Sequence, residues 1–280
     1  MEFQPLEEKT ADKIIGFIPT KGNGPIEVLC DNEVYFAKTS TFSSEPFTDM
    51  ISEILGIYLA RLWGLETAEP CLMIIPSEII HAYLKENSIA LPERYQTTYF
   101  DDVLFFATKR VENSSIIEKY YNDSLTLKDI NKIKNKEDII KIGILDCWLG
   151  NKDRRKASPN LLIANFKIIP IDFEACFAYN QQLKTLKPIH LDLDHTFSIL
   201  NFGLARLVLT QFNKKKNEQL HNELKELIAL SLTHLDAIFS FIPKSYGFSQ
   251  KAKNNVKFVL SNEERNKRVL NSFISYIPNK

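Results

Sequence analysis

The chain has 280 residues, of which 44% are hydrophobic and 25% charged, enough to bury a large core and to form two lobes. Lys plus Arg and Asp plus Glu are both 35, so the formal charge is zero and no global field attracts nucleic acid or an acidic membrane. The opening Met1 to Pro5 leads into acidic residues and no apolar run nears membrane-spanning length, so we expect a cytoplasmic protein that binds neither nucleic acid nor membrane.

The first strands are expected at Ile14 to Pro19 and Ile26 to Cys30. The loop between them contains Gly22 and Gly24, which would let backbone amides approach a phosphate. Its sequence Gly-Asn-Gly-Pro is equally typical of an ordinary turn, so both interpretations stay open.

A third strand, Val34 to Lys38, precedes a helix predicted over Phe47 to Trp63. A lysine at a strand end is commonly a solvated edge residue, and contact with a nucleotide is the alternative for Lys38. Glu53 lies opposite the apolar stripe of the helix, so the periodicity places its side chain in water. The periodicity gives no reason to place this side chain in a cleft beside Lys38.

The second half of the chain is expected to be mainly helical. The apolar periodicity predicts a short helix in Thr126 to Lys136, a central one in Glu137 to Leu149 and a long one in Glu218 to Phe241. A last helix is expected to begin at Ser261, with Glu264 completing a capping box. We interpret these helices as scaffold.

The four cysteines share no metal-ligand spacing and lie mostly in apolar surroundings, which predicts free, buried thiols in a reducing compartment. They are Cys30, Cys71, Cys147 and Cys176.

The most informative stretch runs from Leu149 to Phe177. Asp153 lies in a polar loop after a helix that stops at Gly150, and Asp172 follows a strand, Lys167 to Ile171, that returns from an apolar strand before it. Both carboxylates should therefore emerge at the same end of one hairpin. The basic run around Asp153 would attract phosphate or an acidic substrate.

Phosphoryl transfer needs a carboxylate to receive the hydroxyl proton, an amide and a second carboxylate to hold metal, and a lysine on the nucleotide phosphates. Taken singly, Asp153 and Asp172 are as well explained as turn and strand-end residues. As an ordered set they indicate a phosphotransferase.

In order and spacing, this stretch resembles the catalytic loop and metal-binding segment of the HipA-like kinases. Glu27 to Lys38 is similar to that family's first hairpin, the helix around Glu53 to the helix that follows it, and Phe105 to Arg110 to the segment linking its lobes. The resemblance covers roughly Pro25 to Phe177. It implies an α+β, bilobal, protein-kinase-like fold, with a small β-rich lobe over residues 1–108 and a larger, mainly helical lobe over 109–280.

The resemblance further implies a bacterial serine/threonine protein kinase that uses ATP and Mg²⁺. Asp153 would be the catalytic base and Asp172 the principal metal ligand, while Lys38, supported by Glu53, would orient the phosphates. Ala107 to Lys109 would offer backbone groups to adenine. The expected partners are a protein substrate and an antitoxin-like protein.

The sequence departs from the family pattern at two places. The metal-binding Asn is expected five positions after Asp153, where Ser158 stands, so the second ligand is either Ser158 or Asn160. After Asp172 the pattern leads us to expect His-Gly or similar instead of Phe173 and Glu174, and we interpret Phe173 as a packing residue.

Two other function classes remain. A pseudokinase would keep the fold and act as an interaction module, which the departure at Ser158 favours and the retained Asp153 and Asp172 oppose. A small-molecule or lipid-headgroup kinase would share the same metal chemistry, since Asp-Arg loops also resemble those of phosphoinositide kinases. The neutral charge and the lack of a membrane-binding amphipathic segment count against this class.

Overall fold

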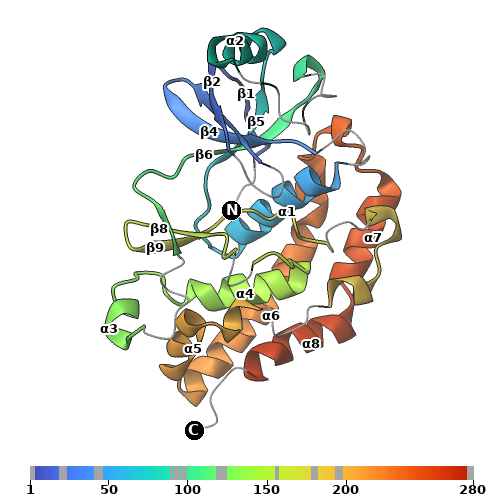
Figure 1. The fold of residues 1–280 in the computed structure, drawn as a ribbon. Helices are drawn as coiled ribbons and strands as arrows, with labels where there is room; N and C mark the ends of the chain where they lie inside the picture. The colour runs from blue at the N-terminus through green and yellow to red at the C-terminus, as the bar shows by residue number, and fades with distance from the viewer. Residues whose placement is uncertain are drawn as a thin grey trace.

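The computed structural model describes residues 4–18, 24–40, 47–88, 90, 95, 100–117, 125–154, 158–177, 182–192 and 198–275. A curled β-sheet formed by the N-terminal part stands on a mainly helical C-terminal part (Figure 1). The predicted α+β class is confirmed.

The larger sheet has six strands in the order β1-β5-β6-β4-β3-β2, antiparallel except for the β1–β5 pair. A two-residue turn joins β3 to β4, with Asp31 and Asn32 both at positive φ (52° and 63°), the geometry whose twist suits a tight hairpin. The strands are β1 (Glu8–Thr10), β2 (Lys13–Phe17), β3 (Ile26–Cys30), β4 (Glu33–Lys38), β5 (Pro70–Ile74) and β6 (Phe105–Lys109).

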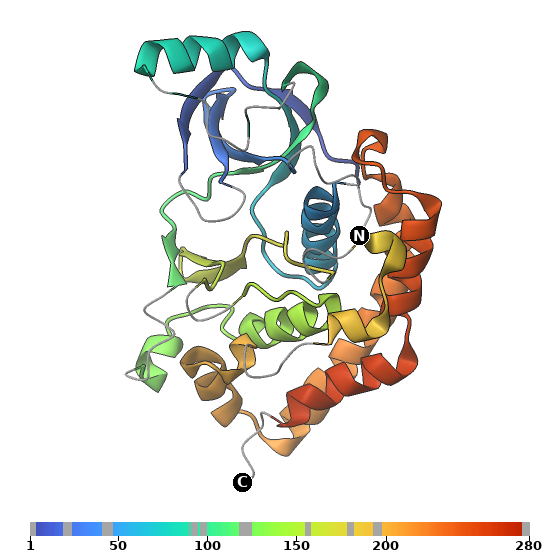
Figure 2. The ribbon, with the colours of Figure 1, turned by 45° about the vertical axis from the view of Figure 1, so that its right-hand side comes forward.

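Helix α2 (Ser77–Asn87) lies across the outer side of this sheet (Figure 2). Alternate residues of the strands form a small core with Ile80 of α2. Leu72 and Phe106 instead belong to the larger core of the helical part. One face of the sheet is thus covered by its own small core, and part of the other face packs on the larger core, as an alternating strand pattern allows.

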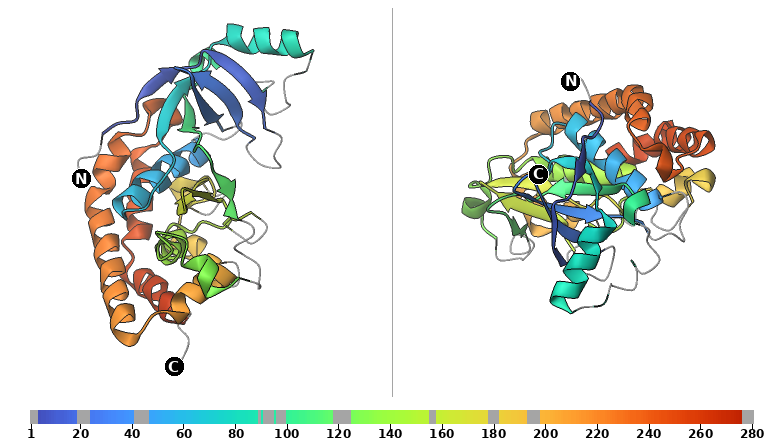
Figure 3. Two further views of the ribbon diagram at one scale, coloured as in Figure 1. Left: turned by 90° about the vertical axis from the view of Figure 1, so that its left-hand side faces the viewer. Right: turned by 90° about the horizontal axis from the view of Figure 1, so that it is seen from above.

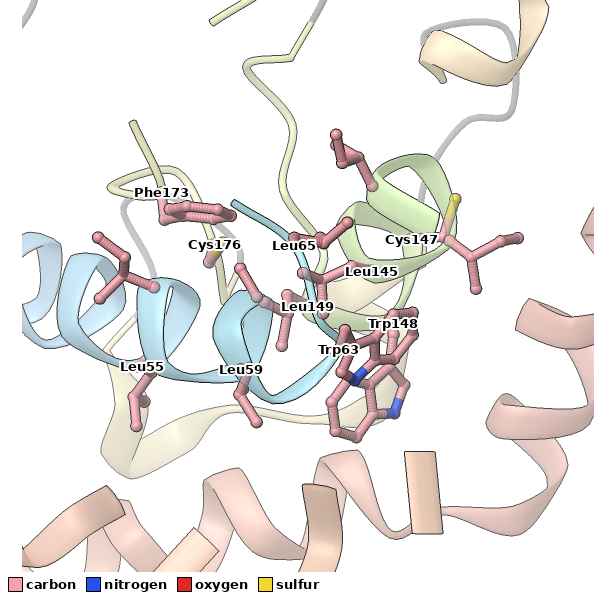
Figure 4. Packing of buried hydrophobic residues seen from close by; sticks show 14 of the residues in the cluster. Leu55, Leu59, Trp63, Leu65, Leu145, Cys147, Trp148, Leu149, Phe173 and Cys176 are labelled. Atoms are coloured by element: carbon pink, nitrogen blue, oxygen red, sulfur yellow. The ribbon is translucent and has the colours of Figure 1, made fainter. Parts of the chain in front are cut away.

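Helix α1 (Thr48–Leu62) belongs to that larger core, although it precedes β5 in the chain. It packs near α4 (Asp138–Leu149), and Trp63 stacks on Trp148 with ring centroids 6.1 Å apart (Figure 4). Both helices are buried nearly all round, which is typical of central helices. The lobe boundary near residue 108 stays a prediction.

The remaining helices surround α1 and α4, and the long α6 runs along one side of the helical part (Figure 3). They are α3 (Leu127–Ile130), α5 (Gly203–Thr210), α6 (Lys214–Ser240), α7 (Gln250–Leu260) and α8 (Glu263–Ser275). Short 3₁₀ turns occur at Phe100–Asp102, Leu183–Thr185, Pro188–Leu191, Ile199–Asn201 and Lys244–Tyr246.

A second, three-stranded sheet, in the order β7-β8-β9, lies beneath the first: β7 (Ser115–Ile116), β8 (Leu161–Ala164) and β9 (Lys167–Pro170). The predicted turn between β8 and β9 is confirmed, with Asn165 and Phe166 at positive φ. This hairpin carries Asp172 just past its end.

Several boundaries differ from the prediction. The last helix is capped by Asn262, whose Oδ1 accepts from the Arg265 N–H at 2.8 Å, and the predicted cap at Ser261 is wrong. Ser261 donates instead to the carbonyl of Phe258 in the preceding helix. Helix α6 starts earlier than predicted because Asn213 caps it.

All four cysteines are free and buried, as predicted. No helix in the described part of the chain combines the length and apolar character needed to cross a bilayer.

Candidate active site

A cleft of about 1070 Å³ separates the two sheets. Phe36, Lys38 and Phe106 line it from the larger sheet, and Leu162 and Pro170 from the β8–β9 hairpin. Except for Gly22 and Gly24, the predicted site residues lie in chain segments that contribute to the wall of this cleft. Lys38, Glu53, Asp153, Ser158, Asn160 and Asp172 all line the cleft.

Lys38 is the last residue of β4, and its side chain meets three carboxylates. Its Nζ lies 2.9 Å from Glu53 Oε1, 3.0 Å from Asp172 Oδ1 and 3.5 Å from Glu174 Oε2. Carboxylate oxygens of the three acids all lie within 4.8 Å of one another. One ammonium group is thus shared by three acids that come from α1 and from the segment after β9.

Glu53 is 3% exposed, so the periodicity-based prediction that it faces water is wrong. The face of α1 opposite the apolar stripe is covered by the segment after β9, and the second carboxylate oxygen of Glu53 accepts the Phe173 N–H at 2.9 Å. The spacing taken from the family resemblance had placed Glu53 beside Lys38, where it lies.

Gly56 explains how the segment approaches α1 so closely. A Cβ at this position would lie 2.4 Å from Phe173 Cβ, closer than real Cβ contacts. Phe173 is itself buried, which confirms its interpretation as a packing residue. Asp172, just before it, has φ 63°, a strained value for a non-glycine residue that aims its carboxylate toward Lys38.

The electrostatics of the cluster follow from burial and from Lys38. Burial raises the pKa of Glu53 more than the Lys38 ammonium lowers it. Burial raises the pKa of Glu174 to about 7, with Lys38 opposing the rise and Asp172 adding to it. For Asp172 burial also acts upward, but Lys38, together with Arg154 and the Glu174 backbone N–H, outweighs it and holds the pKa below its usual value. Asp172 is therefore the most firmly ionised of the three.

The loop that carries Asp153 is fixed by a buried pair that the sequence did not reveal. Helix α4 ends at Gly150 in the left-handed conformation. Asp146, one turn earlier, accepts from Arg154 Nε at 2.7 Å and from Asn151 Nδ2 at 3.0 Å. A single acid within the apolar run of α4 was the available signal, because a buried charge needs a partner.

The interpretation of the basic run around Asp153 as a phosphate-attracting surface is wrong for Arg154. Its side chain is buried, and Nη1 donates to the carbonyl of Ile171 at 3.1 Å and to that of Asn160. The guanidinium carbon lies 5.2 Å from the centre of the Phe173 ring. Arg154 therefore ties the Asp153 loop to the Asp172 segment. Arg155 and Lys156 lie outside the described residues.

Asp153, Asn160 and Ser158 form a hydrogen-bonded row of three polar side chains. Asn160 Nδ2 donates to Asp153 Oδ2 at 3.2 Å, and Ser158 Oγ donates to Asn160 Oδ1 at 3.1 Å. Asn160 has φ 45°, which Asn tolerates better than most residues. Asn160, not Ser158, therefore contacts Asp153 directly.

Two of the residues expected to contact the nucleotide, Ala107 and Gly24, do not line the cleft. Ala107 is fully buried in β6, pairs with Ala37 and Cys71 on its two sides and does not line the cleft. Lys109 lines the cleft and pairs with Glu33. The cleft wall continues from Thr108 through Ile116.

Gly24 offers its carbonyl to Tyr95 Oη at 2.6 Å and is not part of the cleft wall, although its neighbour Pro25 is. Gly22 lies outside the described residues.

Comparisons with known proteins bear on the family and on the fold. A sequence model described as HipA-like kinase matches residues 28–272, extending past the region in which we found the resemblance. The fold is similar to the crystal structure of a Helicobacter pylori proinflammatory kinase, CtkA, with a TM-score of 0.55 and 16% identity over 98% of each chain. No curated protein sequence matches the chain.

Proposed function

Because the chain belongs to the HipA-like kinase family, we propose that it transfers the terminal phosphoryl group of ATP to a serine or threonine hydroxyl of a protein. The observation that carries this proposal is the contact of Lys38 with both Glu53 and Asp172. A lysine held by a helix glutamate and facing a metal-binding aspartate is the arrangement that protein kinases use to orient nucleotide phosphates.

The charge of the cluster supports the use of Mg²⁺-ATP. Lys38 balances only one of the charges that Glu53, Asp172 and Glu174 can carry, and all four groups are at least partly buried. Such an excess of carboxylate oxygens suits a hard divalent cation. When bound, Mg²⁺ would neutralise charge on the phosphates, with Asp172 as its principal ligand.

We assign the second metal ligand to Asn160 and the base to Asp153. The amide nitrogen of Asn160 faces Asp153, which leaves its carbonyl oxygen to act as a hard ligand, and Ser158 holds that oxygen in place. Asp153 would receive the proton of the attacking hydroxyl, and the Asn160 amide steadies its carboxylate.

The adenine contacts are better assigned to the stretch after β6 than to Ala107. The backbone of Ala107 lies between two paired strands, whereas Val111 and Asn113 line the cleft just after Arg110, whose N–H still bonds to Val34. Lys109 stays a candidate through its side chain. Gly24 stays a candidate through its position next to Pro25, which lines the cleft.

The family is associated with toxin–antitoxin systems, so an antitoxin-like protein is a natural partner. We propose a cytoplasmic site of action.

A pseudokinase is the second candidate, and the observation in its favour is the Ser at position 158.

The test is transfer of label from ATP into proteins of a whole lysate, with both Mg²⁺ and Mn²⁺. We expect Asp153→Ala to bind nucleotide normally but to lose on the order of a hundredfold or more in transfer, the scale of a positioned general base. Asp236→Ala, which removes an exposed aspartate on α6, is the control and should transfer as the parent does. Nucleotide binding by the parent without any transfer would establish the pseudokinase instead.

A further inference from the structure

A second cavity, of about 240 Å³, lies between α4, α8 and the 3₁₀ turn Pro188–Leu191. It shares no lining residue with the active-site cleft. Its volume is below the range of roughly 300–1,000 Å³ usual for drug-sized ligands, so it suits a small ion or group.

Arg265 of α8 lines this cavity and is 1% exposed. Its Nη2 donates to the carbonyls of Cys147 and Trp148, at 2.8 Å and 2.7 Å, in the last turn of α4. Its Nε and Nη1 are buried with no hydrogen-bond partner among the residues that the structure describes. Unpaired charged donors are costly in a protein interior and commonly mark the place of a water or an ion.

Arg268 adds a second guanidinium to the same cavity, one turn along α8. The acid that lines the cavity, Asp192, bonds to Arg268 Nη2 at 3.2 Å and 3.3 Å. Its Oδ1 lies 3.9 Å from Arg265 Nε, too far for a hydrogen bond. The cavity wall therefore holds two cations against one carboxylate, while Arg268 Nη1 also donates to the exposed Glu264, outside the wall, at 3.2 Å.

The other lining groups argue against a metal ion. Leu191 and Val269 are apolar, and burial raises the pKa of the Cys147 thiol to about 12, so it supplies no thiolate near neutral pH. Two guanidinium groups would also repel a cation. Planar, forked donors of this kind match the oxygens of phosphate.

We propose that this cavity is a binding site for a phosphate monoester or inorganic phosphate, held by Arg265 and Arg268. An anion oxygen would complete the hydrogen bonds of Arg265 that Asp192 does not reach. The site lies outside the catalytic machinery, and its occupancy does not depend on the proposed kinase activity.

The test is calorimetric titration of the whole chain with inorganic phosphate at constant ionic strength. Arg268→Ala should weaken binding about tenfold or more, because it removes a charge-assisted contact. Lys267→Ala is the matched control, since it removes one exposed positive charge from the position just before Arg268, outside the cavity wall. It should change the phosphate affinity less than about twofold. Any binding of phosphate in the active-site cleft is common to all variants.

Asp192→Asn should act in the opposite direction and strengthen phosphate binding, because it removes the competing carboxylate. Equal phosphate affinity in the parent, Arg268→Ala and Asp192→Asn, or no binding in any of them, would overturn the proposal. O-phosphoserine in place of phosphate identifies the source. Tighter binding indicates a phosphorylated side chain as the ligand, and equal binding indicates free phosphate.

Discussion

Two buried ionic clusters meet the segment around Asp172, and they differ in charge balance. Asp146 and Arg154 form a one-to-one pair whose side chains are 6% and 1% exposed. Lys38 faces Glu53, Asp172 and Glu174, three acids for one base. A buried pair that balances can serve as architecture, whereas surplus buried charge is costly unless a ligand compensates it.

The two clusters also differ in the groups that they contact. Arg154 also donates to the carbonyls of Asn160 and Ile171, so the balanced pair holds the backbone of two loops. The Lys38 cluster is formed mainly by side chains that face the cleft. We therefore expect the Asp146–Arg154 pair to hold the loops of the site in place and the Lys38 cluster to bind nucleotide and metal. Mutations in the first should mainly lower stability, and mutations in the second should mainly lower ligand binding.

The largest effect is expected for Asp172→Ala. Loss of this carboxylate should abolish Mg²⁺-dependent ATP binding, because the cation loses its principal charged ligand. Stability should fall little, since two acids remain for Lys38. Calorimetry with and without Mg²⁺ measures the first and chemical denaturation the second. Equal Mg²⁺-ATP affinity for variant and parent would refute the assignment of Asp172.

Asp146→Asn should show the reverse pattern. It leaves the buried Arg154 charge without its acid, which costs about 3–5 kcal/mol in the free energy of unfolding. Asp138→Asn, on the same helix but only half-buried and bonded to Asn135, is the control and should cost much less. Denaturant titration decides, and similar losses for both variants would mean that the Asp146–Arg154 pair has no special role.

Glu174→Gln should stabilise the ligand-free protein at high pH. The pKa of Glu174, raised from 4.5 to about 7 by burial, means that the folded state binds the proton more tightly than the unfolded state. The resulting stabilisation is present below pH 4.5 and is lost as the pH rises through 7.

The variant should therefore match the parent near pH 4.5 and exceed its free energy of unfolding by about 1–3 kcal/mol at pH 8. Denaturation at the two pH values measures this difference. Glu226→Gln, exposed on α6, is the control and should follow the parent. A variant that is less stable than the parent at pH 8 would show that the cluster carries no surplus charge.

The smallest effects concern the row beside Asp153. Asn160→Ala should lower transfer about tenfold, because it removes both the second metal ligand and the contact to Asp153. Ser158→Ala removes only the support of the amide oxygen and should cost about twofold to threefold. Initial rates of transfer rank the two. A greater loss for Ser158→Ala would make Ser158 the ligand.

Much of the site could be predicted from the sequence because its parts are local. Asp153 follows a helix end, and Asp172 follows a hairpin whose turn is marked by Asn165 and Phe166, so both positions came from local patterns. Lys38 and Glu53 needed the family resemblance. The periodicity of α1 alone pointed Glu53 to water, since it cannot tell a solvated face from one that the segment after β9 covers.

The remaining features depend on tertiary closure. In the sequence Arg154 is one of several neighbouring basic residues, and only the folded loop brings it to Asp146. Likewise, only the folded structure brings Lys38 to Glu174. Helices α2, α5 and α7 and strands β1, β5, β6 and β7 were not predicted as such. The strand β5 is short, begins at Pro70 and is followed by Pro76, which weakens the strand pattern.

A crystal structure with a non-hydrolysable ATP analogue and Mg²⁺ tests the central claim most directly. We expect the cation on carboxylate oxygen of Asp172 and amide oxygen of Asn160, and Lys38 on the phosphates while still paired with Glu53. A nucleotide bound elsewhere, or bound in the cleft with no metal contact to Asp172, would contradict the account.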